Sequence, residues 1–397
     1  MDNIINNKKK IVEYIFLSGI YIYAFGSHMG RAFISLGTGL IFLAWLIKII
    51  FMKDIDFNKS VKYWPIVGLS LVLILSTNAF WTSLGTGTTH SILLPLAILN
   101  LLEEKKTIYK VLIISLTILT ISGFVANYQH LVEGVRRAEG FARFSITSAN
   151  VSVMGIALLL PLLFRKNNKK WQYIVLSIMI FSYTTAVIFS LTRAAYIALI
   201  VVIFLFALIK KPKIIILLLI LMILIIFFAP SNYQSRFLSS FNLEDQWIQS
   251  RLVMWRASID AVIENPIRGV GFKNYSEYFY NLEYTDRSRS SPHNNYFFFL
   301  ASTGIPGFLI FVYLNYYLIK LFFTSYLMFD EKENNLVKNI FLGITLFVIS
   351  FLIMGLTETN ITEAQTRNFF WVVVGLGFSL RYLELDKSSH NKKLENE

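Results

Sequence analysis

Long apolar runs separated by short polar segments follow one another along most of the chain. A helix needs about 20 mostly apolar residues to cross a bilayer, and most of these runs approach that length. The pattern therefore predicts an all-α integral membrane protein with about twelve transmembrane helices. The expected spans are 11–27, 32–52, 62–80, 89–102, 107–126, 148–164, 171–190, 194–209, 213–229, 295–322, 339–356 and 367–382.

Basic residues predict the orientation of these spans. Lys8, Lys9 and Lys10 precede an apolar run that continues as a span without a small-residue cleavage site, so we expect no signal peptide. With the N-terminus in the cytoplasm, basic residues are in excess on the cytoplasmic side, as the positive-inside rule requires. All lysines but Lys273 fall inside, whereas all arginines but two fall outside. Outer arginines suit a phosphate or carboxylate ligand, although chance or lipid anchoring also accounts for part of the split.

Polar segments divide the chain into four expected parts. Residues 1–229 hold nine spans, 230–294 form one large periplasmic loop, 295–385 hold three spans, and 386–397 form a disordered cytoplasmic tail. A second polar segment on the outer side, 127–147, carries three arginines. Outer-face arginines that could contact anionic ligands are Arg136, Arg137, Arg143, Arg287 and Arg289.

The large loop contains one predicted amphipathic helix. Asn242 is its expected N-cap, and Asn265-Pro266 is its expected end. Arg251 and Arg256 flank its apolar stripe. We expect this stripe to lie against the membrane surface or the helix bundle. Its residues, at helical spacing, are Ile248, Leu252, Trp255, Ile259 and Val262.

Composition excludes several classes of protein. Of the 397 residues, 55% are hydrophobic and 15% are charged, whereas a soluble domain carries roughly 25% charged residues. A soluble enzyme and a disordered chain are therefore excluded. The absence of cysteine excludes disulfides, Cys-zinc sites and thiol nucleophiles. On a membrane protein the net charge of +13 reflects topology and does not predict nucleic-acid binding.

His293 is the strongest candidate for catalysis. The segment Ser291-Pro292-His293 predicts the cap and the first two positions of a helix on the outer face. Because the positive end of a helix disfavours a second positive charge, we expect a neutral imidazole that accepts a proton. The alternative is a polar loop residue that merely precedes a span. For the other histidines, His28, His90, His130 and His390, a solvated or interfacial side chain is the expectation.

Arg193 and Arg251 are the candidate cations for an anionic ligand. Arg193 lies between two apolar spans with almost no loop, where a charge is costly and usually faces a cavity or a partner. Its alternative role is snorkelling to lipid headgroups. Arg251 offers a helix-borne guanidinium to a phosphate, and its alternative is a solvated helix face. Phosphate-loop and HExxH motifs and acids at metal-ligand spacing are missing, so we expect neither a cofactor nor a metal.

These motifs together resemble the O-antigen ligase and O-antigen polymerase superfamily over roughly residues 185–310. The combination is more specific for the superfamily than for any member within it. The residues that carry the resemblance are Thr192-Arg193-Ala194-Ala195, Ser250-Arg251, Trp255, Glu264-Asn265-Pro266-Ile267-Arg268-Gly269-Val270-Gly271, Asn274, Pro292-His293-Asn294-Asn295, Ala301, Gly304 and Gly307.

The resemblance implies glycan transfer on the periplasmic face of the bacterial inner membrane. The donor would be an O-antigen polysaccharide on undecaprenyl pyrophosphate, and the acceptor a hydroxyl of lipid A–core. His293 would activate that hydroxyl, while Arg193 and Arg251 would hold the pyrophosphate, in a metal-independent inverting reaction. Possible supporting residues are Arg256, Asn294, Arg136, Arg137 and Arg143.

Two alternative functions stay open. A polymerase of the same superfamily would extend the chain linked to undecaprenyl pyrophosphate and would use the same donor site. A transporter or flippase for a lipid-linked glycan belongs to a different class, and such proteins often place charges at mid-membrane. Here the candidate charges cluster at one membrane face, which favours chemistry over transport.

Overall fold

The computed structural model describes residues 2–52, 63–75, 87–210, 246–271, 274–280, 291–331 and 335–394. Several sequence-based expectations lie outside these residues. They are the span 213–229, the Asn242 cap, and Arg287 and Arg289.

The described residues form helices and contain no β-strand, which confirms the all-α fold class. Among the described residues, seven helical segments are long and apolar enough to cross a membrane, so the chain is a multi-pass membrane protein. The count of twelve spans stays a prediction. The seven are α2 (Arg31–Ile47) with its π-helical continuation η1 (Lys48–Met52), α7 (Lys105–Leu131), α8 (Ser145–Leu163), α9 (Lys170–Phe189), α10 (Arg193–Lys210), α15 (Asn295–Met328) and α16 (Asn335–Met354).

Four further helices coincide with expected spans. Three of them are α1 (Asp2–Gly26), α4 (Trp64–Leu75) and α6 (Gly87–Leu101). The fourth, α17 (Ala364–Leu394), continues well past its expected end. The expectation of a disordered tail from residue 386 is therefore wrong as far as Leu394, because the last helix extends without a break into the polar segment.

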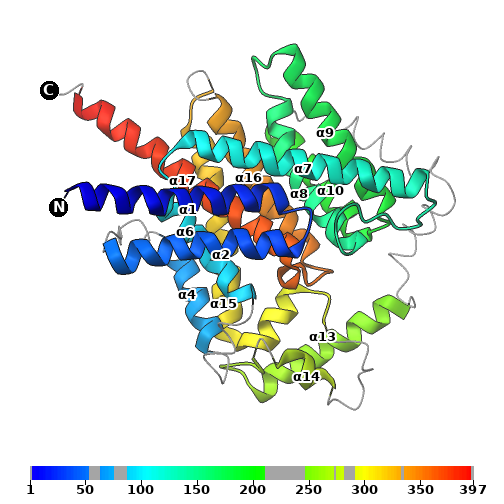
Figure 1. The fold of residues 1–397 in the computed structure, drawn as a ribbon. Helices are drawn as coiled ribbons and strands as arrows, with labels where there is room; N and C mark the ends of the chain where they lie inside the picture. Colours follow the sequence, from blue (N-terminus) through cyan, green and yellow to red (C-terminus); the bar gives the residue numbers. More distant parts are fainter. Residues whose placement is uncertain are drawn as a thin grey trace.

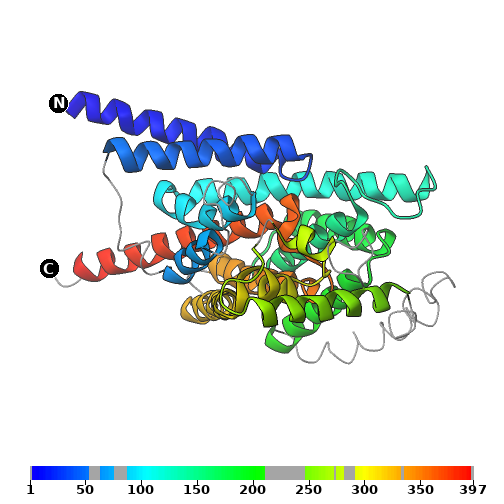
Figure 2. The ribbon, with the colours of Figure 1, turned by 90° about the horizontal axis from the view of Figure 1, so that it is seen from below.

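The helices pack as a bundle around α8. This helix has 83% of its apolar window buried, the largest share among the seven candidate spans, and it contacts α9 on one side and α16 on another. α1 and α2 lie side by side, α6 packs on α17, and α15 packs on both α16 and α4 (Figures 1 and 2). α13 (Gln246–Glu264) and α14 (Tyr275–Tyr280) lie together beside the first part of α15.

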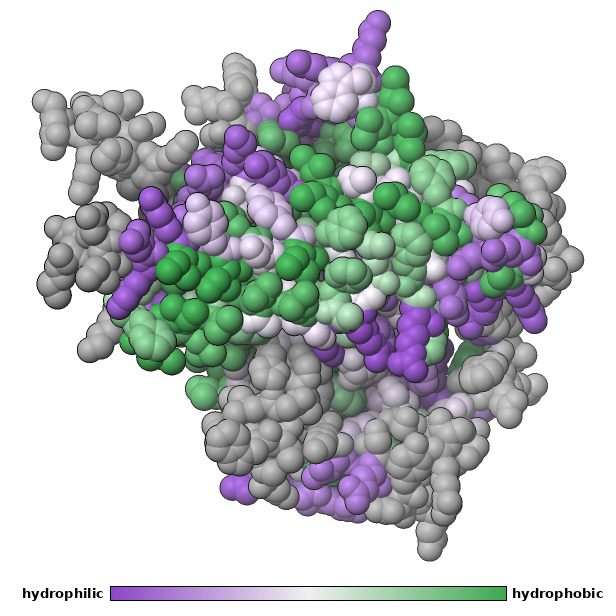
Figure 3. Space-filling model, viewed as in Figure 1, coloured by the Kyte–Doolittle hydropathy of each residue, from purple (hydrophilic) through white to green (hydrophobic). Residues whose placement is uncertain are grey.

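The outer surface of the bundle is apolar where it would meet lipid. A hydrophobic band crosses the face covered by α1, α2 and α7, with polar residues gathered towards its edges (Figure 3). Leu36 on α2 and Ile113 on α7 are 55% and 64% exposed. Leaving such side chains in water costs free energy, whereas hydrocarbon accommodates them.

Ion pairs show which helix ends lie together. Glu331, just beyond the end of α15, lies 3.8 Å from Nζ of Lys210 at the end of α10 and 3.4 Å from Nζ of Lys166. The ends of α10 and α15 at Lys210 and Glu331 therefore lie together. The opposite end of α10 begins at Arg193, and the opposite end of α15 begins at Asn295.

α15 is broken at Gly304, which has a φ of 68° and a ψ of −172°. Pro306 has no N–H group, so the carbonyl of Ser302 loses its normal helical donor. Backbone N–H groups from the segment after α13 replace the lost donors. Val270 N donates to Ala301 O at 2.9 Å, and Gly271 N donates to Ser302 O at 3.0 Å. In return, Ile305 N donates to Pro266 O at 2.8 Å.

Two glycines make this exchange of backbone hydrogen bonds possible. Gly269 has a φ of 65°, and a Cβ there would lie 2.4 Å from the Ala301 carbonyl oxygen. A Cβ on Gly304 would lie 2.6 Å from the Pro266 carbonyl oxygen. Both positions combine a left-handed backbone with a backbone neighbour inside contact distance, so only glycine fits. We call residues 265–271, docked on this break, the glycine latch.

The end of α13 at Glu264 confirms the stop predicted at Asn265-Pro266. The predicted apolar stripe does not pack against the bundle as one face, so its position at the membrane surface stays a prediction. The helix buries Met254, Ala257, Ser258 and Ala261, whereas Leu252 and Ile259 are 42% and 47% exposed. Small residues allow the backbones of α13 and α15 to approach closely, which the large stripe residues would prevent. On this buried face of α13, Ser258 Oγ lies 3.2 Å from the hydroxyl of Tyr275 on α14. Burial raises the pKa of the Tyr275 phenol.

Candidate active site

His293 lies before α15 and not within its first turn. The N-cap is Asn294, whose side-chain oxygen accepts hydrogen bonds from the N–H groups of Tyr296 and Phe297 at 2.8 and 3.1 Å. The prediction that Ser291 caps the helix is therefore wrong, because Asn294 already satisfies the first free donors. His293 itself has a φ of 47°, an uncommon backbone conformation for a residue other than glycine.

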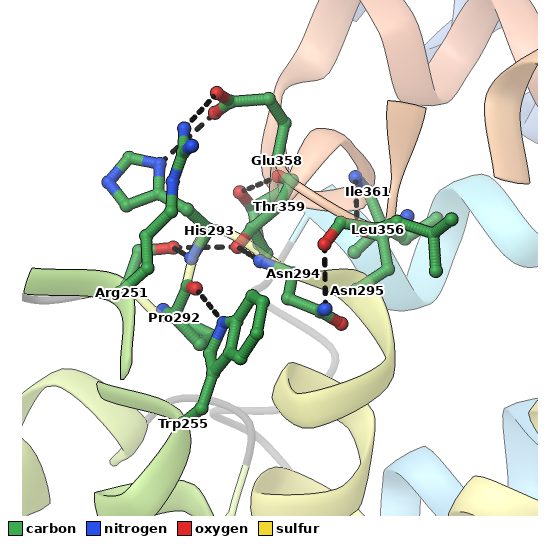
Figure 4. Close-up of polar contacts among 12 residues, drawn as sticks. Arg251, Trp255, Pro292, His293, Asn294, Asn295, Leu356, Glu358, Thr359 and Ile361 are labelled. Atoms are coloured by element: carbon green, nitrogen blue, oxygen red, sulfur yellow. Dashed lines mark hydrogen bonds and ion pairs between the residues drawn. The ribbon is translucent and has the colours of Figure 1, made fainter. Parts of the chain in front are cut away.

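The carboxylate of Glu358 contacts both His293 and Arg251 (Figure 4). Its Oε2 lies 3.1 Å from Nδ1 of His293, and its Oε1 lies 2.8 Å from Nη2 of Arg251. Glu358 comes from the segment between α16 and α17, and its side chain is only 10% exposed, against 50% for His293. An ionised carboxylate only accepts hydrogen bonds, so beside it Nδ1 of His293 is the donor in this contact.

Hydrogen bonds hold the Glu358 segment against the start of α15. The backbone N–H of Asn294 donates to Thr359 Oγ1 at 3.1 Å, and its side-chain amide donates to the Leu356 carbonyl at 2.8 Å. The buried Asn295 side chain accepts from the N–H of Ile361 at 3.2 Å. These hydrogen bonds involve residues before and after Glu358 in the sequence, so they fix the position of its carboxylate relative to the imidazole (Figure 4).

α13 brings Arg251 to the same place through Trp255. The indole Nε1 of Trp255 donates to the Pro292 carbonyl at 2.9 Å, one residue before His293, and its ring stacks on Phe297 with centroids 5.2 Å apart. Arg251 lies one turn earlier on the same helix face. α13 therefore supplies a cation at the site and also holds the backbone that carries the imidazole.

Arg193 is the first residue of α10. It follows a tight turn in which Leu191 has a φ of 53°. Arg137 holds this turn, since its Nε donates to the Ser190 carbonyl at 3.0 Å, and the N–H of Ala138 donates to the Phe189 carbonyl at 3.1 Å. A phosphate-binding role of Arg193 stays a prediction, and Arg137 acts at least in part as a cap for the end of α9.

The remaining supporting candidates differ in their surroundings. Arg136 and Arg256 are exposed, while the guanidinium of Arg143 lies 5.2 Å from the centre of the Phe144 ring. Asn294 is buried and caps α15, so it positions its neighbour His293. Ligand contacts by these four residues stay predictions.

The other histidines have separate environments. His28 is 2% exposed, and its Nε2 lies 3.2 Å from Ser115 Oγ, so the expected solvated or interfacial position is wrong. It lies in the turn between α1 and α2, which folds back onto Phe369. Nδ1 of His130 lies 2.9 Å from the Val135 carbonyl oxygen at the end of α7, and its ring stacks on Phe189. The side chains of His90 and His390 lie outside the described part of the chain.

Sequence reasoning did not find Glu358. It lies 65 residues after His293, and no local motif links the two positions. One signal was present in the sequence, because Glu358 is an acidic residue in the short polar segment between the last two expected spans. The alternation of spans places that segment on the same side of the membrane as His293.

The arrangement suits nucleophile activation beside an anionic leaving group. An imidazole oriented by a carboxylate is the common form of a general base, and an arginine beside it compensates developing negative charge. Within the described ranges, no group of three or more histidine and acidic side chains is placed to hold a metal ion.

The comparison with known families agrees with this geometry. A family model described as O-antigen ligase matches residues 178–312, from α9 into α15, and this segment includes Arg193, Arg251 and His293. Glu358 lies beyond the matched segment. No curated protein matches the chain. The family match confirms the resemblance carried by the motifs. The matched family consists of membrane glycosyltransferase-like ligases and polymerases.

Proposed function

We propose that the chain is an O-antigen ligase that transfers a polysaccharide from undecaprenyl pyrophosphate to lipid A–core on the periplasmic face of the inner membrane. The observation that carries the proposal is the contact between Glu358 Oε2 and Nδ1 of His293, 3.1 Å apart, beside Arg251. The family match supports the class of reaction. The division into nine spans, a periplasmic loop and three spans belongs to the same proposal.

In the proposed reaction, Nε2 of His293 accepts the proton of an acceptor sugar hydroxyl. The hydroxyl oxygen forms a bond to the anomeric carbon of the donor, while the bond from that carbon to the pyrophosphate oxygen breaks. The leaving undecaprenyl pyrophosphate takes the electron pair. Glu358 keeps Nδ1 protonated and stabilises the imidazolium that forms. Attack opposite the leaving group inverts the anomeric centre.

Arg251 and Arg193 are proposed to compensate the charge of the departing pyrophosphate. A guanidinium has five N–H donors, and the contact of Arg251 with Glu358 leaves most of them for a phosphate. This electrostatic stabilisation replaces the role that a divalent cation plays in other transferases. The donor is already activated by its pyrophosphate, so the proposal includes neither a metal nor a cofactor.

A polymerase is the second candidate, because the family match fits both activities. The two reactions share the donor and differ in the acceptor. The outer-face arginines favour lipid A–core, whose phosphates would meet them through charge-assisted hydrogen bonds.

The glycolipid profile of a deletion strain tests the choice. Loss of a ligase should leave bare core, with long glycan accumulating on undecaprenyl pyrophosphate. Core carrying a single repeat unit would identify a polymerase instead. Donor-linked single units confined to the cytoplasmic leaflet would identify a flippase, and an unchanged profile would reject all three functions.

A further inference from the structure

α13 has two opposite apolar faces of different kinds. The inner face carries the small or flexible side chains of Met254, Ala257, Ser258 and Ala261, which are buried against the bundle. The outer face carries large side chains that the bundle does not cover. Leu252, Ile259 and Ile263 are 42%, 47% and 72% exposed. Their spacing of seven and four residues places them in one row along the helix.

This outer row continues onto the membrane-facing side of α15. Ile267, in the glycine latch, is 73% exposed, and the preceding Pro266 carbonyl accepts a hydrogen bond from Ile305 N at 2.8 Å. Ile305 and Leu309, one turn apart on α15, are 45% and 58% exposed. α15 is one of the candidate membrane spans, so its exposed apolar side chains face lipid. One apolar surface therefore runs from the lipid-facing side of α15 through Ile267 onto α13.

Two cations border this surface. Arg256 lies beside the row on α13, and Arg268 directly follows Ile267; both side chains are exposed. The acidic Glu264 projects from another side of the helix, where its Oε2 accepts a hydrogen bond from the Tyr278 hydroxyl at 2.9 Å. Large apolar side chains with arginines at their edge are typical of a helix that lies in a membrane interface.

We propose that α13 binds the surface of the bilayer at the end of the bundle that carries Glu358. Ile259, Ile263 and Ile267 insert among the upper acyl chains, and Arg256 and Arg268 contact anionic headgroups. This inference goes beyond the proposed glycan transfer and does not depend on it. Because Arg251 is on the same helix, membrane binding by α13 holds that guanidinium at headgroup height, where the phosphates of any lipid-linked substrate lie.

The chain has no cysteine, so single spin labels report without background. The full-length variants Ile259→Cys, Ile263→Cys and Ile267→Cys are labelled with a nitroxide and reconstituted into nanodiscs of phosphatidylethanolamine and phosphatidylglycerol. Glu264→Cys is the matched control, one residue along the helix from Ile263. Ile113→Cys on α7 is the lipid-facing reference. Collision rates are measured with oxygen, which concentrates in hydrocarbon, and with a neutral nickel chelate, which stays in water.

The three isoleucine sites should give an oxygen-to-nickel ratio several-fold above that of Glu264→Cys and approaching that of Ile113→Cys. Ratios equal to that of Glu264→Cys would overturn the proposal, because the face would then be in water. Low collision rates with both reagents would also overturn it, because protein, either a second copy or a partner, would then cover the face.

The headgroup contact is tested by changing lipid charge. Replacing phosphatidylglycerol with phosphatidylcholine should lower the ratio at Ile263→Cys, and the double substitution Arg256→Gln with Arg268→Gln should abolish that dependence on lipid. If the ratio at Ile263→Cys does not change with lipid composition while Arg256 and Arg268 are both intact, the proposed contact of these arginines with anionic headgroups is wrong.

Discussion

Glu358 joins His293 to Arg251, with its Oε2 3.1 Å from the imidazole Nδ1 and its Oε1 2.8 Å from the guanidinium Nη2. A single buried carboxylate thus orients both His293, the proposed base, and Arg251, the proposed phosphate-binding residue. A pyrophosphate bound by the remaining N–H donors of Arg251 would share that guanidinium with Glu358. Donor binding and orientation of the base would then be coupled through Arg251 and Glu358.

Glu358→Gln should lower the rate of transfer about 10²-fold to 10⁴-fold while the protein still folds. The amide keeps the shape of the side chain but loses the charge that orients Arg251 and stabilises the imidazolium. Initial rates with purified protein and a lipid-linked donor measure the effect. Glu363→Gln is the control, since Glu363 pairs with Arg31 and not with the imidazole. Wild-type rates in Glu358→Gln would remove Glu358 from the mechanism.

His293→Ala should abolish transfer, a loss of about 10² to 10⁴ in rate, while the protein still inserts and binds donor. Donor retention on the purified variant separates a lost base from a lost binding site. His130→Ala, at the end of α7, is the control. Transfer by the unsubstituted protein should also survive EDTA. Loss in EDTA with rescue by a divalent cation would mean that acidic residues form a metal site.

Arg251→Lys and Arg193→Lys should each lower transfer roughly thirty-fold, if one oriented phosphate contact is worth about 2 kcal/mol. Lysine keeps the charge but loses the planar fork that binds two oxygens at once. Steady-state rates at several donor concentrations measure the loss. Arg165→Lys is the control, since Arg165 contacts the Asn168 side chain and has no proposed role in binding. Near-normal transfer by Arg193→Lys would assign that residue to lipid headgroups instead.

Gly269→Ala and Gly304→Ala should each destabilise the fold by about 2 kcal/mol or more. Each adds a Cβ to a left-handed backbone, and the nearest carbonyl oxygens would lie 2.4 and 2.6 Å away. Gly134→Ala separates the two causes, because Gly134 also has a φ of 70° but no atom within 4 Å of an added Cβ. Thermal unfolding in detergent should therefore show the smallest loss of stability for Gly134→Ala. Equal losses of stability in all three variants would mean that the close contact between the glycine latch and α15 is unimportant.

A reporter active only in the periplasm should give signal when fused after Asn274 and none when fused after Asn168. The expectation comes from the excess of basic residues on the proposed cytoplasmic side. Expression of both fusions is checked by immunoblot. The reverse pattern would place His293 on the cytoplasmic side, away from the proposed donor.

The sequence by itself determined the fold class and most helix positions, because the bilayer acts on each apolar run separately. Hydropathy is a local property, so runs such as 107–126 and 171–190 reappear as α7 and α9. The sequence also identified His293, Arg251 and Arg193 as candidates for the site, and their roles in binding and catalysis stay predictions. Asn265-Pro266 marked the end of α13 because proline restricts the residue before it.

Only the tertiary structure decided how these residues are used. The pairing of Glu358 with His293 joins positions 65 residues apart, and it depends on how α15, α16 and α17 pack. The buried face of α13 was decided by the close approach of α15, which selects Ala257 and Ala261 over larger residues. His293 lies outside the helix because Asn294, and not the predicted Ser291, is the N-cap of α15. Each outcome depends on contacts between distant segments, which a local pattern of apolar and polar residues does not contain.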